Sequence, residues 1–148
     1  TAAVLAPNAV VDTWKRTSRW AFPLKTIDQL EGLPEEQWPD RVEGSCTYTL
    51  YPGVMVLVNA SGAQMIRAEP GDRPGSSRVV YAGLRHPDSD PSTAQQAFAF
   101  GGDVFEREDL PVAEQCQRGL AGARDLLLGR NEPLLQFWHR LWDEAAAP

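Results

Sequence analysis

The chain has 148 residues, of which 43% are hydrophobic and 23% charged, and its net charge is −6. This length and composition are those of one soluble globular domain. The acidic balance argues against nucleic acid or an anionic membrane as the main partner. No apolar run approaches the roughly 18 to 20 residues that a membrane-spanning helix needs. The two cysteines, Cys46 and Cys116, show no metal-ligand spacing, so a reducing, cytoplasmic setting is expected.

Residues 1–7 contain neither an initiator Met nor a basic leader, so we expect the chain to begin partway through a longer protein. The first regular element is predicted as a short strand ending near Pro23, because Trp20, Phe22 and Leu24 alternate with other residues. Residues 27–38 have helix-like spacing that Gly32 and Pro34 interrupt. This segment therefore predicts a broken surface helix and loop.

The middle of the chain is rich in β-branched and aromatic residues. It predicts strands at residues 47–51, 54–58, 63–68 and 78–84. A turn at residues 59–62 would join the second and third of them as a hairpin. The last three strands are therefore expected to be antiparallel, and a polar loop is expected at residues 86–95.

Two helices are predicted after the sheet. The first covers residues 109–128, and Gly101 and Gly102 before it are expected to form a turn. The second follows an Asn131 cap and covers residues 132–146, with a strong apolar face. Strands followed by helices predict an α+β fold, in which helices pack on one face of an antiparallel sheet.

Asp109 is the most informative single residue, because it heads an apolar helix stripe. The stripe consists of Val112, Ala113, Cys116, Leu120, Ala123 and Leu127. A carboxylate on that side is costly to bury unless a cap, a partner or a metal compensates it. The local pattern favours a helix N-cap, because Asp is a preferred cap and Pro111 suits a first turn. A metal ligand is the alternative, and Cys116 is expected to be a small buried hydrophobe.

Familiar catalytic templates are missing from the sequence, which has no G-x-S-x-G elbow, Walker loop or G-x-G-x-x-G motif. The two histidines, His86 and His139, lie far apart, and neither has a second histidine at helical spacing. A two-histidine, one-carboxylate iron site within this chain would need both of them to converge with Asp109. Surface positions are the favoured interpretation of both.

Two segments resemble a known family. Residues 105–109, Phe-Glu-Arg-Glu-Asp, resemble a stretch near the C-terminus of the large (alpha) subunits of Rieske-type non-haem iron oxygenases. These are the aromatic-ring-hydroxylating dioxygenases and related monooxygenases. Residues 129–142 resemble the closing helix of the same subunits, and the resemblance extends from about Trp14 onward. It implies a helix-grip fold (START/Bet v1-like), of which residues 1–148 would be the C-terminal part of the catalytic domain.

The resemblance also implies a chemistry. The last residue of the first motif, Asp109, would be the carboxylate ligand of a mononuclear Fe(II), with Arg107 and Gln115 as contributors around it. The enzyme would insert oxygen from O₂ into an aromatic or other apolar substrate. Electrons would come from a reductase or ferredoxin through a [2Fe–2S] Rieske cluster, commonly in a homotrimer. Candidate substrate-pocket residues are Phe98, Phe100 and Val104, although core packing is their alternative interpretation.

Parts of the family pattern have no counterpart here. The Cys-x-His segments of a Rieske domain and the two iron-binding histidines are absent from residues 1–148. We therefore expect the two histidines and the cluster to lie outside this chain, and the segment alone to be inactive. The alternatives are a metal-free helix-grip module that binds an apolar small ligand, and a purely structural segment in which Asp109 caps a helix.

Overall fold

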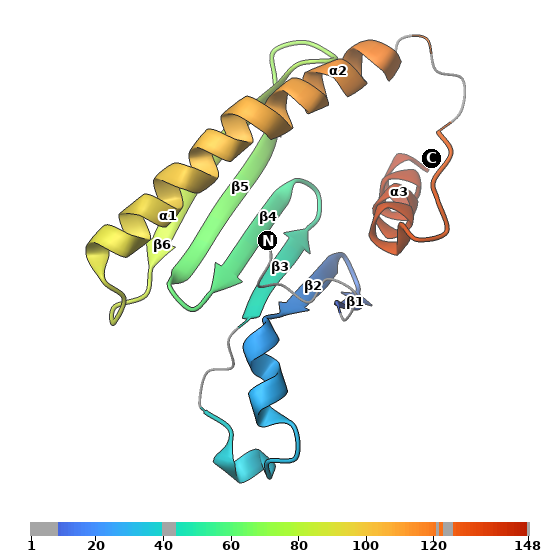
Figure 1. Cartoon of the computed structure of the whole chain (residues 1–148). Coiled ribbons are helices and arrows are strands. Elements are labelled where there is room, and N and C mark those ends of the chain that lie inside the picture. The colour runs from blue at the N-terminus through green and yellow to red at the C-terminus, as the bar shows by residue number, and fades with distance from the viewer. Residues whose placement is uncertain (1–8, 40–43, 121, 123–125, 148) are drawn as a thin grey trace.

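The computed structural model describes residues 9–39, 44–120, 122 and 126–147. Its centre is a six-stranded sheet in which each strand pairs antiparallel with the next, in the order β1 to β6 (Figure 1). The strands are β1 (Val10–Trp14), β2 (Thr17–Pro23), β3 (Gly44–Leu50), β4 (Val54–Asn59), β5 (Gly62–Pro70) and β6 (Ser77–Arg85). The predicted hairpin at residues 59–62 is confirmed, and so are the strands on either side of it.

The sheet is wider than predicted, because β1 was not expected and β2 begins earlier than residue 20. The sequence signal of β1 is hidden by polar residues at its centre. Asp12 lies directly opposite Arg19 on β2, and the Arg19 Nε and Nη2 atoms donate to its carboxylate at 2.9 and 2.5 Å. Charged cross-strand pairs stabilise a sheet face that meets water, so this strand needs no apolar alternation.

The register defines an inner face of the sheet. Directly opposite residues point to the same side, and one row crosses all six strands: Thr13, Ser18, Thr49, Met55, Ile66 and Tyr81. The neighbouring row carries Val11, Trp20, Thr47, Leu57, Gln64 and Gly83. The outer face carries the Asp12–Arg19 pair and, at the other edge, the Glu69–Arg78 pair.

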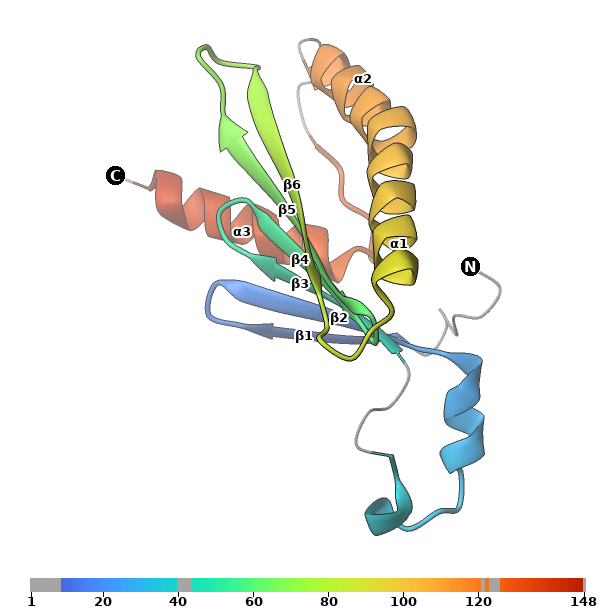
Figure 2. The same ribbon diagram turned by 90° about the vertical axis from the view of Figure 1, so that its left-hand side faces the viewer.

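A single long helix follows the sheet and lies along β5 and β6 (Figures 1 and 2). It consists of α1 (Pro91–Val104), the π-helical turn η4 (Phe105–Asp109) and α2 (Leu110–Leu120). The predicted loop at residues 86–95 is therefore wrong from Pro91 onward, and the predicted helix start at Asp109 lies inside the helix. The predicted end near residue 128 is also wrong, since the helix ends at Leu120.

The predicted turn at Gly101 and Gly102 is wrong for a packing reason. A Cβ atom at Gly101 would lie 2.5 Å from the Tyr81 hydroxyl oxygen and 2.9 Å from Gln64 Oε1. A Cβ atom at Gly102 would lie 3.4 Å from the Tyr81 ring. The two glycines are therefore sites of close approach between α1 and the sheet, rather than turn residues.

The helix is capped by Asp90, not by Asp109. The Asp90 carboxylate accepts hydrogen bonds from the backbone N–H of Thr93 at 2.8 Å and from the Ser92 hydroxyl at 2.6 Å. These bonds lower the pKa of Asp90 to about 2, with the Ser92 hydroxyl as the main cause. The N-cap interpretation of Asp109 is thus excluded, because Asp109 lies 18 residues into the helix.

The last helix, α3 (Pro133–Ala146), agrees with prediction except at its start, where Glu132 rather than Asn131 occupies the cap position. It contacts β1, and its Trp138 and Trp142 rings lie against the Tyr51 ring, with centroids 5.8 and 4.9 Å apart. Leu141 on this helix is 6% exposed and is the only buried apolar residue in the described part of the chain. The predicted α+β fold of an antiparallel sheet with C-terminal helices is confirmed.

The broken helix expected at residues 27–38 is confirmed as two short 3-10 helices, η2 (Lys25–Leu30) and η3 (Glu35–Gln37). The predicted chain start at residues 1–7 and the stripe residue Ala123 lie outside the described residues. Among the helices that are described, none has the length and apolar character to cross a membrane.

The apolar stripe of the helix is not covered by other described residues. Val112 and Leu120 are exposed, and so is Cys116, which was expected to be buried. Large apolar side chains are also exposed on the sheet, including Met55 at the middle of its inner face. Contiguous exposed apolar surface is typical of sites that another protein segment or a ligand covers.

Candidate functional site

The middle turn of the long helix, η4, departs from α-helical geometry, and Asp109 is its last residue. In η4, the N–H of Leu110 donates to the carbonyl oxygen of Phe105, five residues earlier. Such π-helical turns are rare and frequently mark functional sites. Pro111 gives a local cause, because its ring lacks an N–H and would clash with the carbonyl four residues earlier in a regular α-helix. A wider turn directly before Pro111 relieves that conflict.

Burial along the helix follows this turn. Phe105 is half-buried, and the next half-buried residue is Leu110, five positions on. Glu108 and Asp109 are both exposed. In a regular α-helix, the residue four positions after Phe105, which is Asp109, would lie closest to its face, about 40° away around the helix axis. The π-helical turn therefore brings Leu110 to that face and leaves the Asp109 carboxylate exposed to one side.

An aromatic stack holds the helix to the sheet beside this turn. The Tyr81 ring of β6 stacks on Phe98 with centroids 4.6 Å apart and on Phe105 with centroids 6.4 Å apart. Its hydroxyl donates to the backbone carbonyl of Phe98 at 3.3 Å. Partial burial raises the pKa of Tyr81, so that the hydroxyl stays protonated as a donor. Tyr81 thus fixes the position of the helix on both sides of Gly101.

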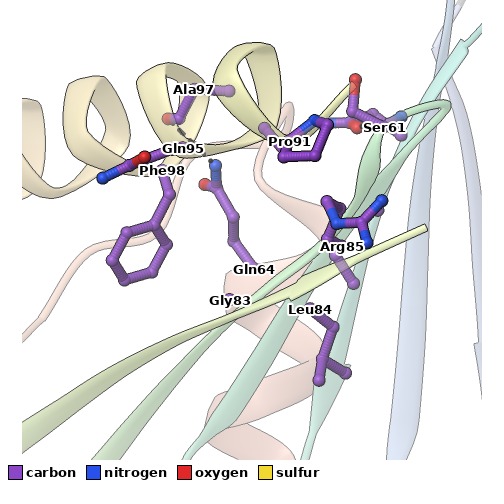
Figure 3. Close-up of a pocket in the computed structure, with 13 residues that line it drawn as sticks. Ser61, Gln64, Gly83, Leu84, Arg85, Pro91, Gln95, Ala97 and Phe98 are labelled. Carbon is purple, nitrogen blue, oxygen red and sulfur yellow. Dashed lines mark hydrogen bonds between the residues drawn. The ribbon is translucent and has the colours of Figure 1, made fainter. Parts of the chain in front are cut away.

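Beside this stack, a cavity of about 310 Å³ lies between the first turns of α1 and the ends of β5 and β6 (Figure 3). Gln64 rises from β5 toward the helix, and its Nε2 atom donates to the Ala97 carbonyl at 3.3 Å. Phe98 hangs from the helix beside it, while Leu84 points away from the helix. Gly83 forms part of the floor and leaves room for the Phe98 ring, which a Cβ atom there would meet at 2.5 Å.

Arg85 lines the opposite end of the cavity, below Pro91 (Figure 3). Its Nη1 atom donates to the backbone carbonyls of His86, Pro87 and Ser89 at 3.1, 2.8 and 2.7 Å. The guanidinium therefore orders the loop that leads from β6 into α1. The cavity combines one cation and several polar groups with the apolar surface of Phe98.

The structure separates the predicted pocket residues. Phe98 lines the cavity. Phe100 is 72% exposed, and Val104 is half-buried; neither of them lines it. Their part in a substrate pocket stays a prediction. Gln64 is not among the pocket residues that the sequence predicts. The one signal for it in the sequence is that it is a polar residue between apolar residues of its strand.

The described residues hold no group of three His, Cys, Asp or Glu side chains that could bind a metal ion. His139 is exposed on α3, and His86 lies in the loop after β6, where its Nδ1 atom accepts from the Asp88 N–H at 3.2 Å. Arg107 forms an ion pair with Asp103 at 2.7 Å, one helical turn earlier. The turn η4 therefore presents three exposed carboxylates, those of Glu106, Glu108 and Asp109, but the described part of the chain holds no complete metal-ligand set.

Residues 7–147 match the profile of one known family, the ring hydroxylating alpha subunit (catalytic domain). The chain belongs to this family. The resemblance found in residues 105–109 and 129–142 is thereby confirmed, and the six-stranded antiparallel sheet with its C-terminal helices fits the helix-grip fold. The ring-hydroxylating oxygenase catalytic domain is an oxidoreductase domain, and the family uses non-haem iron, O₂ and an apolar substrate. No curated protein and no solved structure matches the chain.

Proposed function

We propose that this chain is the C-terminal portion of a Rieske-type oxygenase catalytic domain and that Asp109 is its carboxylate ligand to iron. The observation that carries the proposal is the exposed Asp109 carboxylate at the end of a π-helical turn. Such a side chain has no structural role as a cap, since Asp90 caps the helix. The exposed apolar surface of the sheet and of α2 supports a further part of the domain packing against this chain.

The residues present fit one third of an iron site. A facial triad of two histidines and one carboxylate is the typical ligand set of non-haem Fe(II) oxygenases. Asp109 provides the carboxylate, and the two histidines would come from outside the described residues. Bound Fe(II) would supply the activation of O₂. This chain's part is to hold the carboxylate in place, through the aromatic stack of Phe105 on Tyr81.

Arg107 and Gln115, which the sequence suggested as neighbours of the ligand, differ in what supports them. The Arg107 guanidinium is paired with Asp103, so it is not a free cation beside Asp109. Gln115 is exposed on α2, six residues after Asp109. A hydrogen bond from a side chain of this kind would orient a ligating carboxylate.

For the substrate, we propose a small aromatic or other apolar molecule that reaches the inner face of the sheet. Met55 and Leu57 on that face and the Phe98 ring offer apolar surface. Electrons would arrive from a reductase or ferredoxin through a [2Fe–2S] Rieske cluster outside this chain. The assembly would be a cytoplasmic homotrimer, as the family resemblance implies. Without the two histidines and the cluster, the segment alone would be inactive.

One observation favours a second candidate, a module that binds a small ligand without a metal. The cavity between α1 and the sheet exists within the described chain, and its wall includes the Phe98 ring. Retention of an apolar fluorescent probe by metal-free protein, and its loss on a Phe98→Ala change, would support this alternative. It would replace the proposed oxygenase function only if Asp109 proves dispensable for iron binding.

The test is iron binding by the full-length protein that carries this segment. Replacing Asp109 by Ala should abolish stoichiometric iron, because two histidines alone form a weak site. Replacing Glu108 by Ala is the matched control, since Glu108 is the exposed neighbour in the same turn. Wild-type iron content in the Asp109→Ala protein, with an unchanged circular dichroism spectrum, would reject the assignment.

A further inference from the structure

The π-helical turn changes which residue of the helix meets the sheet. Phe105 stacks on Tyr81, so its side of the helix is the one that contacts β6. In an uninterrupted α-helix, Asp109 would follow on that same side one turn later. The helix runs antiparallel to β6, because Phe98 meets Gly83 and Gln117 lies near Gly75.

The next inward position of β6 after Tyr81 is Val79, which is half-buried and pairs with Ala68 of β5. An α-helical Asp109 would therefore turn its carboxylate toward an apolar part of the sheet. Burial of a carboxylate against apolar groups without a partner is strongly unfavourable. It would also hide the oxygen atoms that a metal needs.

The π-helical turn avoids this arrangement because it contains one extra residue. Leu110 takes the half-buried position, and Asp109 is rotated aside by about the 100° that one residue spans in an α-helix. The helix keeps its contact with the sheet on the α1 side, where Phe98 and Phe105 stack on Tyr81, and the extra residue is absorbed within η4. Phe105 N–H still donates to the carbonyls of Gly101 and Gly102 on the entering side.

We propose that the π-helical turn Phe105–Asp109 is the device that presents the Asp109 carboxylate to iron, with Leu110 as the positioning residue that occupies the sheet-facing place instead. This inference rests on the proposed role of Asp109 as a ligand. It adds that an aspartate at position 109 is not enough for iron binding, because the carboxylate also has to be oriented by the turn. The extra residue of the turn has to lie before Leu110, so that Leu110 and not Asp109 faces the sheet.

A matched pair of deletions tests the inference in the full-length protein. Both variants carry Pro111→Ala, so that a straight helix contains no proline clash. Deleting Glu108 places Asp109 three residues and Leu110 four residues after Phe105, so that Leu110 keeps the sheet-facing place. Deleting Leu110 places Asp109 four residues after Phe105, on the sheet-facing side. Each deletion removes one residue and restores an α-helical repeat.

The readouts are iron content and the EPR signal of the Fe(II)–nitric oxide adduct, with circular dichroism and the melting temperature as measures of folding. The Glu108 deletion should retain wild-type iron binding and the wild-type signal. The Leu110 deletion should bind iron at least about tenfold more weakly, as expected when the orientation of a ligand is lost. Equal iron binding by the two folded variants, or loss in both, would overturn the inference.

A variant of unchanged length covers the case in which the deletions do not fold. Exchanging the two residues, Asp109→Leu with Leu110→Asp, moves the carboxylate to the half-buried place within an intact turn. Iron binding should again fall by at least about tenfold, and retention of iron would contradict the inference. The Asp109→Ala protein separates the two proposals. If it keeps its iron, the ligand assignment fails; if it loses iron while the Leu110 deletion keeps it, only the role of the turn fails.

Discussion

The hydroxyl oxygen of Tyr81 lies so close to Gly101 that a Cβ atom at that position would come within 2.5 Å of it. The same atom would come within 2.9 Å of Gln64 Oε1. Both neighbours are polar ends of side chains that also bond to the helix backbone, through the carbonyls of Phe98 and Ala97. The contact between α1 and the sheet is therefore both close and hydrogen-bonded.

Replacing Gly101 by Ala should push α1 away from the sheet. Added volume in a packed contact typically costs about 1–3 kcal/mol, and here it would also weaken the Tyr81 and Gln64 hydrogen bonds. Gly119 is the matched control, because a Cβ atom there meets nothing within 4 Å. Gly119→Ala should raise the free energy of unfolding by about 0.5–1 kcal/mol. Urea unfolding of the two variants gives the comparison, and equal effects would contradict the close contact.

A second prediction concerns Ser18 on β2, which lies in the inner-face row of the sheet. Ser18 is fully buried, and its Oγ donates to Thr49 Oγ1 at 3.0 Å across β2 and β3. Removing one partner of a buried hydrogen bond costs about 1–3 kcal/mol. Ser18→Ala should therefore destabilise the protein by about 1 kcal/mol or more. A double-mutant cycle with Thr49→Val measures the coupling, which should be close to zero only if the hydroxyls do not interact.

Leu141 and Leu135 offer a comparison within one helix. Leu141 is 6% exposed, whereas Leu135 is 49% exposed. Replacing a buried leucine by alanine typically lowers the free energy of unfolding by about 2–5 kcal/mol. The same replacement at an exposed position typically changes it by no more than about 0.5 kcal/mol. The melting temperature of Leu141→Ala should therefore lie well below that of Leu135→Ala. A comparable loss in both would mean that α3 is not anchored through Leu141.

The sequence predicted best where local chemistry alone decides the structure. The hairpin at residues 59–62 and the amphipathic helix α3 were found from turn residues and helical periodicity. β1 was missed because its central Asp12 depends on a cross-strand arginine for its place in the sheet. The glycine pair 101–102 predicts a turn from local sequence alone, since a close approach to Tyr81 is a long-range contact that local patterns do not contain.

The candidate site shows the same division. Asp109 was singled out because a carboxylate on an apolar stripe needs an explanation, and the family resemblance supplied one. Its surroundings were not predictable, because they depend on a π-helical turn that shifts the helix register by one residue. Pro111 was the available signal. It was interpreted as a first-turn residue, whereas it lies inside a helix that begins 20 residues earlier.

The last prediction concerns Asp90, whose hydrogen bonds at the start of α1 lower its pKa to about 2. Because the folded-state pKa lies below the usual value of about 3.9, the ionised carboxylate stabilises the folded state. That stabilisation is complete above about pH 4 and is lost as the pH falls through about 2. The melting temperature of the wild type should therefore fall over this range in part because Asp90 becomes protonated.

Asp90→Asn isolates that contribution, since Asn is an equally favoured N-cap but does not titrate. At neutral pH its melting temperature should lie close to that of the wild type, while Asp90→Ala should melt lower. Between pH 4 and pH 2, the difference between wild type and Asp90→Asn should shift in favour of the Asn variant, because only the wild type loses an ionised cap. A difference that stays constant across that range would show that the Asp90 carboxylate does not bond to Ser92 and Thr93 in the folded protein.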